Sequence, residues 1–120
     1  MLGCEQLYVG RGAVSVLVVD GRSEAAEWLN ELPGDAFRKF MAVAKQLAAH
    51  GFIPNEQKFR RLDDDVYEMK LRHPPLRLFC FRHGRNWVIT HGVTKPGARE
   101  LRTQVAKVKS LRRRLMEETT

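Results

Sequence analysis

The spacing of apolar residues predicts one strand and one short helix near the start of the chain. Residues 14–19 are apolar and mostly β-branched, and the turn-forming pair Asp20 and Gly21 follows, which is typical of a strand that ends in a turn. Ser23 then offers an N-cap oxygen to a short helix that ends before Pro33. The apolar face of this helix consists of Ala25, Trp28, Leu29 and Leu32.

A second helix follows directly. Asp35 can cap its start, His50 and Gly51 mark its end, and its apolar residues follow the i, i+3, i+4, i+7 spacing of one helix face. These residues are Phe37, Phe40, Met41, Ala44, Leu47 and Ala48. Because the two helices are consecutive, we expect an αα-hairpin.

The periodicity then changes from helical to strand-like. We expect a short strand at 58–62, a polar turn at 63–65, and further strands at 66–72, 76–82 and 87–93. His73, Pro74 and Pro75 interrupt this series, since proline cannot donate to a strand ladder, and Gly84 and the residues after it supply a hairpin turn. Three or four sequential antiparallel strands are the result.

The last element is a long helix. From residue 98 to residue 118 no helix breaker occurs, and a thin apolar stripe runs between basic residues. The expected order is β-α-α-β-β-β-β-α. This order indicates an α+β fold, a single layered domain over residues 1–120 in which the helical hairpin covers one sheet face.

Charge is distributed unevenly along the chain. The 120 residues include 21 Lys and Arg against 14 Asp and Glu, a net charge of +7. Residues 1–65 hold 8 basic and 10 acidic residues, a net of −2, whereas residues 66–120 hold 13 and 4, a net of +9. A polyanionic partner is the first expectation, nucleic acid above all, because binding phosphates releases counterions.

Several classes of protein are disfavoured. The longest apolar run, residues 13–19, is interrupted by Ser15 and is far shorter than the ~20 residues of a membrane span. No secretory signal is recognisable, so we expect a cytoplasmic protein with no membrane partner. P-loop, dinucleotide and HExxH motifs are absent, and no histidine lies at ligand spacing from a cysteine, so we expect neither metal nor cofactor. Cys80 is expected to be an inert residue of an apolar strand.

The informative constellation is cationic. Glu68, Lys70 and Arg72 project to one face of their strand, because alternate residues point to opposite sides. Arg77 begins the next strand and Lys95 follows the last one, so antiparallel pairing could gather them on one basic surface. Lysine, arginine and histidine side chains could together supply a base for the 2′-proton of RNA, cations for the phosphorane and an acid for the leaving oxygen, without a metal. Taken singly, strand cations are mostly solvated side chains, and composition alone supports only a basic binder of nucleic acid or acidic protein.

Four stretches of the chain carry a family resemblance. They are DGRSEAAEWLNELP (20–33), LAAHG (47–51), VYEMKLRHPPLRLFCF (66–81) and WVITHGVTKPGARELRTQVAKV (87–108). In order and spacing they resemble the RelE/ParE superfamily of bacterial and phage toxins, in its HigB-like, phage-derived branch, over residues 14–114. The resemblance implies a RelE-like fold, with a small twisted antiparallel sheet, an N-terminal αα-hairpin on one face and a basic C-terminal helix.

The resemblance also implies a function. RelE-like members are endoribonucleases that cut mRNA, commonly in the ribosomal A site, and are neutralised by a cognate antitoxin. We therefore expect a type II toxin that cleaves mRNA on the ribosome by metal-independent 2′-hydroxyl attack, with a helix-turn-helix, HigA-like antitoxin as partner. Carried over by position, Lys70, Arg77 and Lys95 are the catalytic candidates. His91 is a further acid or base candidate, and His73 is the alternative for that role. The expected RNA-binding residues are Arg72, His73, Arg99 and Arg102.

Two other functions suit the same superfamily. A ParE-like protein inhibits DNA gyrase without catalysis, and a catalytically silent relative binds only its antitoxin or nucleic acid. Fold alone does not separate these alternatives. The ribonuclease hypothesis requires Lys70, Arg77 and Lys95 to matter, and the gyrase hypothesis does not.

Overall fold

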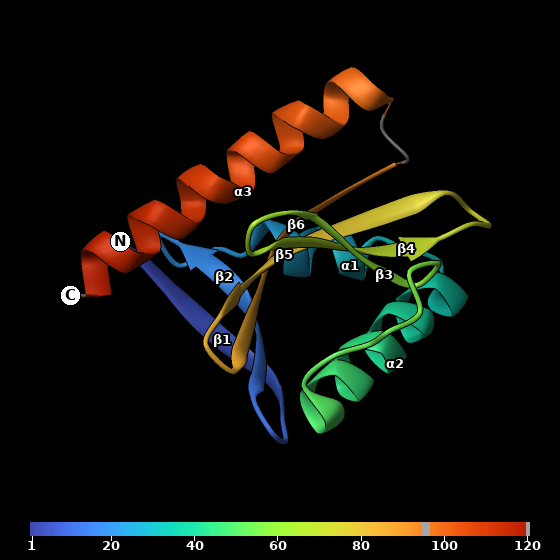
Figure 1. The fold of residues 1–120 in the computed structure, drawn as a ribbon, viewed down its shortest axis with the longest axis horizontal. Helices are drawn as coiled ribbons and strands as arrows, with labels where there is room; N and C mark the ends of the chain where they lie inside the picture. The colour runs from blue at the N-terminus through green and yellow to red at the C-terminus, as the bar shows by residue number, and fades with distance from the viewer. Residues whose placement is uncertain (95–96, 120) are drawn as a thin grey trace.

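The computed structural model describes residues 1–94 and 97–119, with only the backbone of Ala98. Its elements, shown in Figure 1, are β1 (Leu2–Val9), β2 (Ala13–Val19), α1 (Glu24–Asn30), α2 (Gly34–His50), β3 (Phe59–Asp63), β4 (Val66–Leu71), β5 (Leu76–His83), β6 (Asn86–Thr94) and α3 (Ala98–Thr119). The expected element order was therefore wrong at its start, where it lacked β1. Most residues of this edge strand are partly or fully exposed, so apolar alternation is weak there.

The strands form one six-stranded sheet in the order β1-β2-β6-β5-β4-β3. Figure 1 shows α3 crossing one side of this sheet and α2 lying on the other. Residues of α1 and α2 form one buried core with the sheet, and Val108 and Leu115 of α3 form a second core with the opposite face. The fold is thus a three-layer α+β arrangement, in which α3 determines what the second face of the sheet exposes.

The sheet is mixed, which corrects the expected antiparallel sheet. The pairs β3–β4, β4–β5 and β5–β6 are antiparallel, as predicted for the sequential strands. However, β2 pairs with β6 in parallel, with Val14 opposite Trp87 and Val16 opposite Ile89. This pairing joins segments more than 70 residues apart, which the local pattern of either strand does not reveal.

The helix ends follow local chemistry with one exception. The Ser23 hydroxyl accepts a 3.1 Å hydrogen bond from the backbone N–H of Ala26, as an N-cap does. Gly51 ends α2 in the left-handed conformation, with φ 78°. The predicted Asp35 cap was wrong, because α2 begins one residue earlier and Asp35 instead pairs with Arg38 at 2.6 Å in the first turn.

Candidate functional site

Two of the predicted catalytic residues face each other across the β4–β5 ladder. Lys70 lies directly opposite Arg77, and Glu68 lies directly opposite Phe79, a residue of the core beneath α3. Since residues two apart share a face, Lys70, Glu68 and Arg77 all lie on the α3 side of the sheet. The expected gathering of Lys70 and Arg77 on one surface is therefore present in the described residues.

A buried carboxylate holds the centre of this cluster. The Glu68 side chain is 0% exposed, and its Oε2 accepts a 2.8 Å hydrogen bond from Arg60 Nε and lies 2.5 Å from Arg60 Nη2. Its Oε1 lies 3.1 Å from Arg77 Nε, outside hydrogen-bonding geometry. A buried carboxylate this close to two guanidinium groups is held by charge, and it fixes both arginines relative to the sheet.

Arg77 is only partly available to a ligand. Its side chain is 12% exposed, and Nη1 donates 3.2 Å hydrogen bonds to the backbone oxygens of Leu71 and Leu76. Among the described residues, no hydrogen bond or ion pair involves Arg77 Nη2. The part of this guanidinium that can contact a phosphate is therefore Nη2.

Lys70 is the cluster's titratable cation. Its Nζ lies 3.4 Å from the backbone oxygen of Glu56, in the loop before β3. Desolvation by burial lowers the pKa of Lys70 below the ordinary lysine value, and the nearby charge of Arg60 lowers it further, while Glu68 opposes the shift. A lysine whose ammonium form is disfavoured is a better proton acceptor than a solvated one.

The predicted RNA-binding residues are exposed on two other segments of the chain. Arg72 and His73 are exposed in the turn between β4 and β5, and Arg99 and Arg102 are exposed in the first turns of α3. Arg102 also lines a hollow of about 330 Å³ beside Leu62 of β3. Lys95 lies outside the described residues.

His91 is placed differently from the other predicted catalytic residues. Its side chain lies in the interior, and the residue is 1% exposed. Nδ1 lies 2.8 Å from Thr90 Oγ1, Nε2 lies 2.6 Å from Gln104 Oε1, and the ring stacks on Phe79 at 5.1 Å. Burial lowers its pKa, and the Lys107 charge adds to this, while the hydrogen bond to Gln104 opposes it. The imidazole connects β6 to α3, and solvent and substrate do not reach it.

His91 and Gly92 lie next to a bulge in β6, and each contacts a different helical layer. A bulge in β6 interrupts the pairing with β5 between Phe79 and Cys80, opposite Thr90. A side chain at Gly92 would collide with the indole ring of Trp28, which packs there from α1. The pair therefore fixes both helical layers to one strand, which is a structural role.

Acids pair with three of the seven basic residues of α3. Lys107 pairs with Glu24 at 2.9 Å, Lys109 with Asp63 at 2.5 Å, and Arg112 with Asp65 at 3.3 Å. Acids of the N-terminal half thus pair with part of the positive charge of the C-terminal half, and the chain keeps its net charge of +7.

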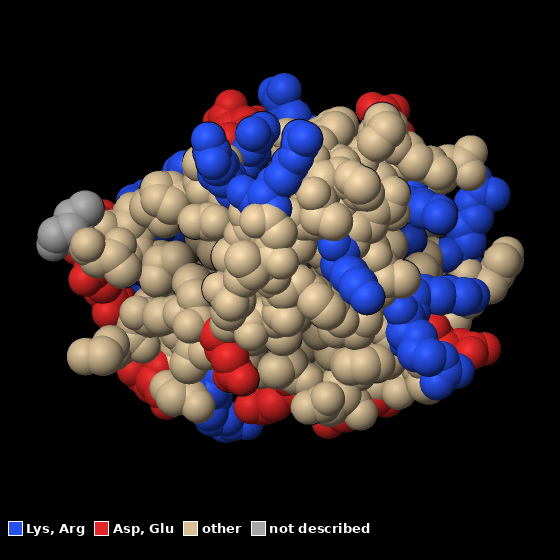
Figure 2. All heavy atoms as spheres, turned by 90° about the horizontal axis from the view of Figure 1, so that it is seen from below, with Lys and Arg blue, Asp and Glu red and all other residues tan. Residues whose placement is uncertain are grey.

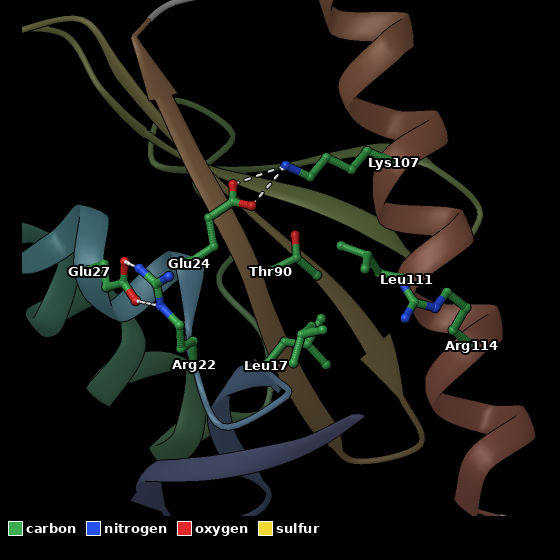
Figure 3. Close-up of a pocket in the computed structure, with 9 residues that line it drawn as sticks. Leu17, Arg22, Glu24, Glu27, Thr90, Lys107, Leu111 and Arg114 are labelled. Carbon is green, nitrogen blue, oxygen red and sulfur yellow. Dashed lines mark hydrogen bonds and ion pairs between the residues drawn. The ribbon is translucent and has the colours of Figure 1, made fainter. Parts of the chain in front are cut away.

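A hollow of about 380 Å³ between α1, β6 and α3 shows the same pairing in Figure 3. Lys107 reaches across it to both carboxylate oxygens of Glu24, and Arg22 pairs with Glu27 on the other side. Because each carboxylate has a cation, the hollow has no uncompensated acid for a metal. Among the described residues, no group of three or more His, Cys, Asp and Glu side chains is arranged to hold a metal ion.

Sequence reasoning missed one residue of the central cluster and misjudged another. Arg60 was not selected, although the charge pattern places it in a strand preceding Glu68. Glu68 was placed on the correct face, but its complete burial between two arginines was not foreseen. Cys80 is free and buried, and burial raises the pKa of its thiol far above its usual range, as expected for an inert cysteine.

Comparison with known proteins identifies the family. In the part of the chain that the structure describes, no helix has both the length and the apolar character needed to cross a membrane. No curated protein matches the chain. Residues 27–116, which include β3 to β6 and most of α3, match the model of the phage-derived protein Gp49-like family (DUF891). This is a RelE/HigB-type toxin family associated with toxin–antitoxin systems, and its toxins have antitoxin partners. The match covers most of the chain, and the protein therefore belongs to the Gp49-like family.

Proposed function

We propose that this protein is the toxin of a type II toxin–antitoxin system and acts as a metal-independent endoribonuclease on mRNA. The supporting observation is the pairing of Lys70, whose pKa is lowered, with Arg77 directly across the ladder and with Arg60 nearby. Together these three residues offer a proton acceptor and two guanidinium groups on one sheet face. This combination suits a reaction in which a proton is removed and negative charge grows on a phosphate.

The chemistry can be written with these side chains. The neutral Lys70 amine takes the proton of the RNA 2′-hydroxyl, and the 2′-oxygen forms a bond to phosphorus. Arg77 Nη2 and the exposed part of Arg60 stabilise the charge of the phosphorane. The bond from phosphorus to the 5′-oxygen then breaks, and the departing oxygen takes up a proton, for which the exposed His73 in the adjoining turn is the proposed donor. The products are a 2′,3′-cyclic phosphate and a 5′-hydroxyl.

Two residues have positioning roles in this proposal. Glu68 orients both arginines and is too deeply buried to contact RNA. His91 takes no part in proton transfer, because both of its ring nitrogens are hydrogen-bonded in the interior. The acid or base role that the sequence suggested for His91 passes to His73, which is exposed.

RNA and protein partners extend the proposal. Arg72, Arg99 and Arg102 are exposed and would bind phosphates on either side of the cleaved bond, with Lys95 as a further candidate. We propose mRNA on the ribosome as substrate, a helix-turn-helix, HigA-like antitoxin as inhibitor, and the cytoplasm as the location. An acidic segment of the antitoxin would suit the same cationic surface.

Primer extension on cellular mRNA after induction tests this function. We expect new 5′ ends in cells that express the natural chain, and their loss with Lys70→Ala or Arg77→Ala. Lys45→Ala is the matched control, since it removes an exposed lysine from α2. Circular dichroism of the purified variants establishes that each one is folded.

Three results would contradict the proposal. Full RNA cleavage by both site variants would show that Lys70 and Arg77 are not required for catalysis. Growth arrest without any new RNA ends, together with inhibited DNA supercoiling, would instead establish the gyrase alternative. Neither growth arrest nor new RNA ends, with antitoxin binding retained, would establish the catalytically silent alternative.

A further inference from the structure

A second cationic groove lies at the opposite end of the sheet. Three chain turns converge there: the β1–β2 turn, the C-terminus of α2, and the β5–β6 turn. They form a groove of about 510 Å³, which we call the turn platform, lined by Arg11, His50, Gly51, Phe52, Arg82 and Arg85. Figure 2 views the molecule from the side of these turns, and Lys and Arg side chains stand together on that face.

Close backbone contacts hold the turn platform in place. A side chain at Gly12 would collide with the backbone oxygen of Arg85, and one at Gly10 would lie 2.5 Å from the backbone oxygen of Ala48. The Arg11 N–H donates a 2.8 Å hydrogen bond to that same Ala48 oxygen. The backbones that carry Arg11 and Arg85 are therefore fixed before any ligand arrives, which lowers the entropic cost of binding.

The arginines of the turn platform have no acidic partners within the described part of the chain, unlike Lys107, Lys109 and Arg112 of α3. Among the described residues, no ion pair involves Arg11, Arg82 or Arg85. All three are exposed, and Arg82 is oriented by a 3.0 Å hydrogen bond to the Gly84 oxygen and by the Trp87 ring at 5.6 Å. Three uncompensated guanidinium groups in one groove favour a polyanion.

Phe52 narrows the choice of polyanion. It is a 49% exposed aromatic residue in the lining of the groove, and its ring is held edge-on by Phe59 at 6.1 Å and Tyr67 at 6.5 Å. A supported aromatic face among arginines can stack an unpaired base while the guanidinium groups bind phosphates. The carboxylates of an acidic peptide would pair with the arginines but would not stack on the Phe52 ring.

We propose that the turn platform binds single-stranded RNA, with a base on Phe52 and phosphates on Arg11, Arg82 and Arg85. It is separate from the proposed cleavage cluster. Arg82 is five residues from Arg77 along β5, roughly 17 Å, and an odd spacing places the two on opposite faces of the sheet. The inference rests on the proposed function only for the choice of RNA as the ligand. It gives that RNA a second contact away from the scissile phosphate.

Fluorescence anisotropy with a labelled, fully 2′-O-methylated RNA 12-mer tests this site without any cleavage. The test variant is the double substitution Arg11→Ala with Arg85→Ala. The matched control is Lys39→Ala with Lys45→Ala, which removes the same charge from exposed positions of α2. We expect the test variant to bind about tenfold more weakly at low salt. The slope of log affinity against log salt concentration should be smaller by about 1.4 for this variant, while the control changes little.

Further arms test the aromatic contact and the kind of partner. Phe52→Ala should weaken binding about fivefold or more. Equal weakening by the test and control variants, or tighter binding of a poly-glutamate peptide than of RNA, would overturn the proposal.

Lys70→Ala separates this inference from the cleavage proposal. We expect it to abolish cleavage of unmodified RNA and to leave binding at the turn platform unchanged. If the natural chain cleaves no RNA but the platform variants bind RNA more weakly than the control, the inference holds and the proposed catalysis fails. If cleavage depends on Lys70 while the platform variants bind like the control, the inference fails alone.

Discussion

Acidification should weaken the fold through His91. The folded protein resists protonation of this buried imidazole, because burial lowers its pKa and both nitrogens already have partners. The unfolded chain takes up the proton near the ordinary pKa of 6.5. Stability is therefore fully present above that pH and is lost as the pH falls below it. For one histidine between pH 7.5 and 5.5, the loss has an upper limit of about 1.4 kcal/mol.

Urea unfolding at pH 7.5 and 5.5, followed by the fluorescence of Trp28 and Trp87, measures this loss. The same pair of measurements on His91→Gln is the control, since the exposed histidines are the same in both proteins. We expect the variant to be less stable at pH 7.5 and to lose less stability on acidification than the natural chain. An equal loss in both proteins would refute the structural role of the His91 proton.

Three further predictions concern the sheet. Glu68→Gln should lower the free energy of unfolding by about 3 kcal/mol in the same assay, because it leaves buried guanidinium charge uncompensated, while Glu56→Gln in an exposed loop should change little. Gly92→Ala should cost about 1–3 kcal/mol by displacing Trp28, with a shift in tryptophan emission. The pH profile of the single-turnover rate of RNA cleavage should depend on Lys70, because the reaction requires its neutral form and burial lowers its pKa; an unchanged profile in Lys70→Arg would contradict the general-base role.

Local pattern was sufficient for most of the elements. Strands β3 to β6 and all three helices have clear apolar periodicity and turn residues, so their positions and order could be predicted. Strand β1 could not, because Glu5 and Gln6 lie on an exposed edge where no apolar alternation is required. The turn between β1 and β2, with Gly10 and Gly12, was the available signal for a hairpin.

Long-range geometry accounts for what sequence reasoning left out. The shared face of Lys70 and Glu68 follows from strand alternation, and antiparallel pairing of neighbouring strands brings Arg77 to it, so only Arg60 of the cluster was missed. Burial depends on what α3 covers, so neither the interior position of His91 nor that of Glu68 could be read from spacing. The matching of α3 cations by acids from distant turns likewise requires the fold, as the pair of Lys109 with Asp63 illustrates.

The most direct test of the proposed cleavage chemistry uses an mRNA that carries a single 2′-deoxy substitution at a mapped cleavage site. Purified protein is added to ribosomes translating this mRNA or its unmodified counterpart. We predict that the unmodified mRNA is cut to give a 2′,3′-cyclic phosphate, and that both the 2′-deoxy substitution and Lys70→Ala prevent cleavage at that position. Cleavage of the 2′-deoxy mRNA at the same site would contradict 2′-hydroxyl attack and the role assigned to Lys70.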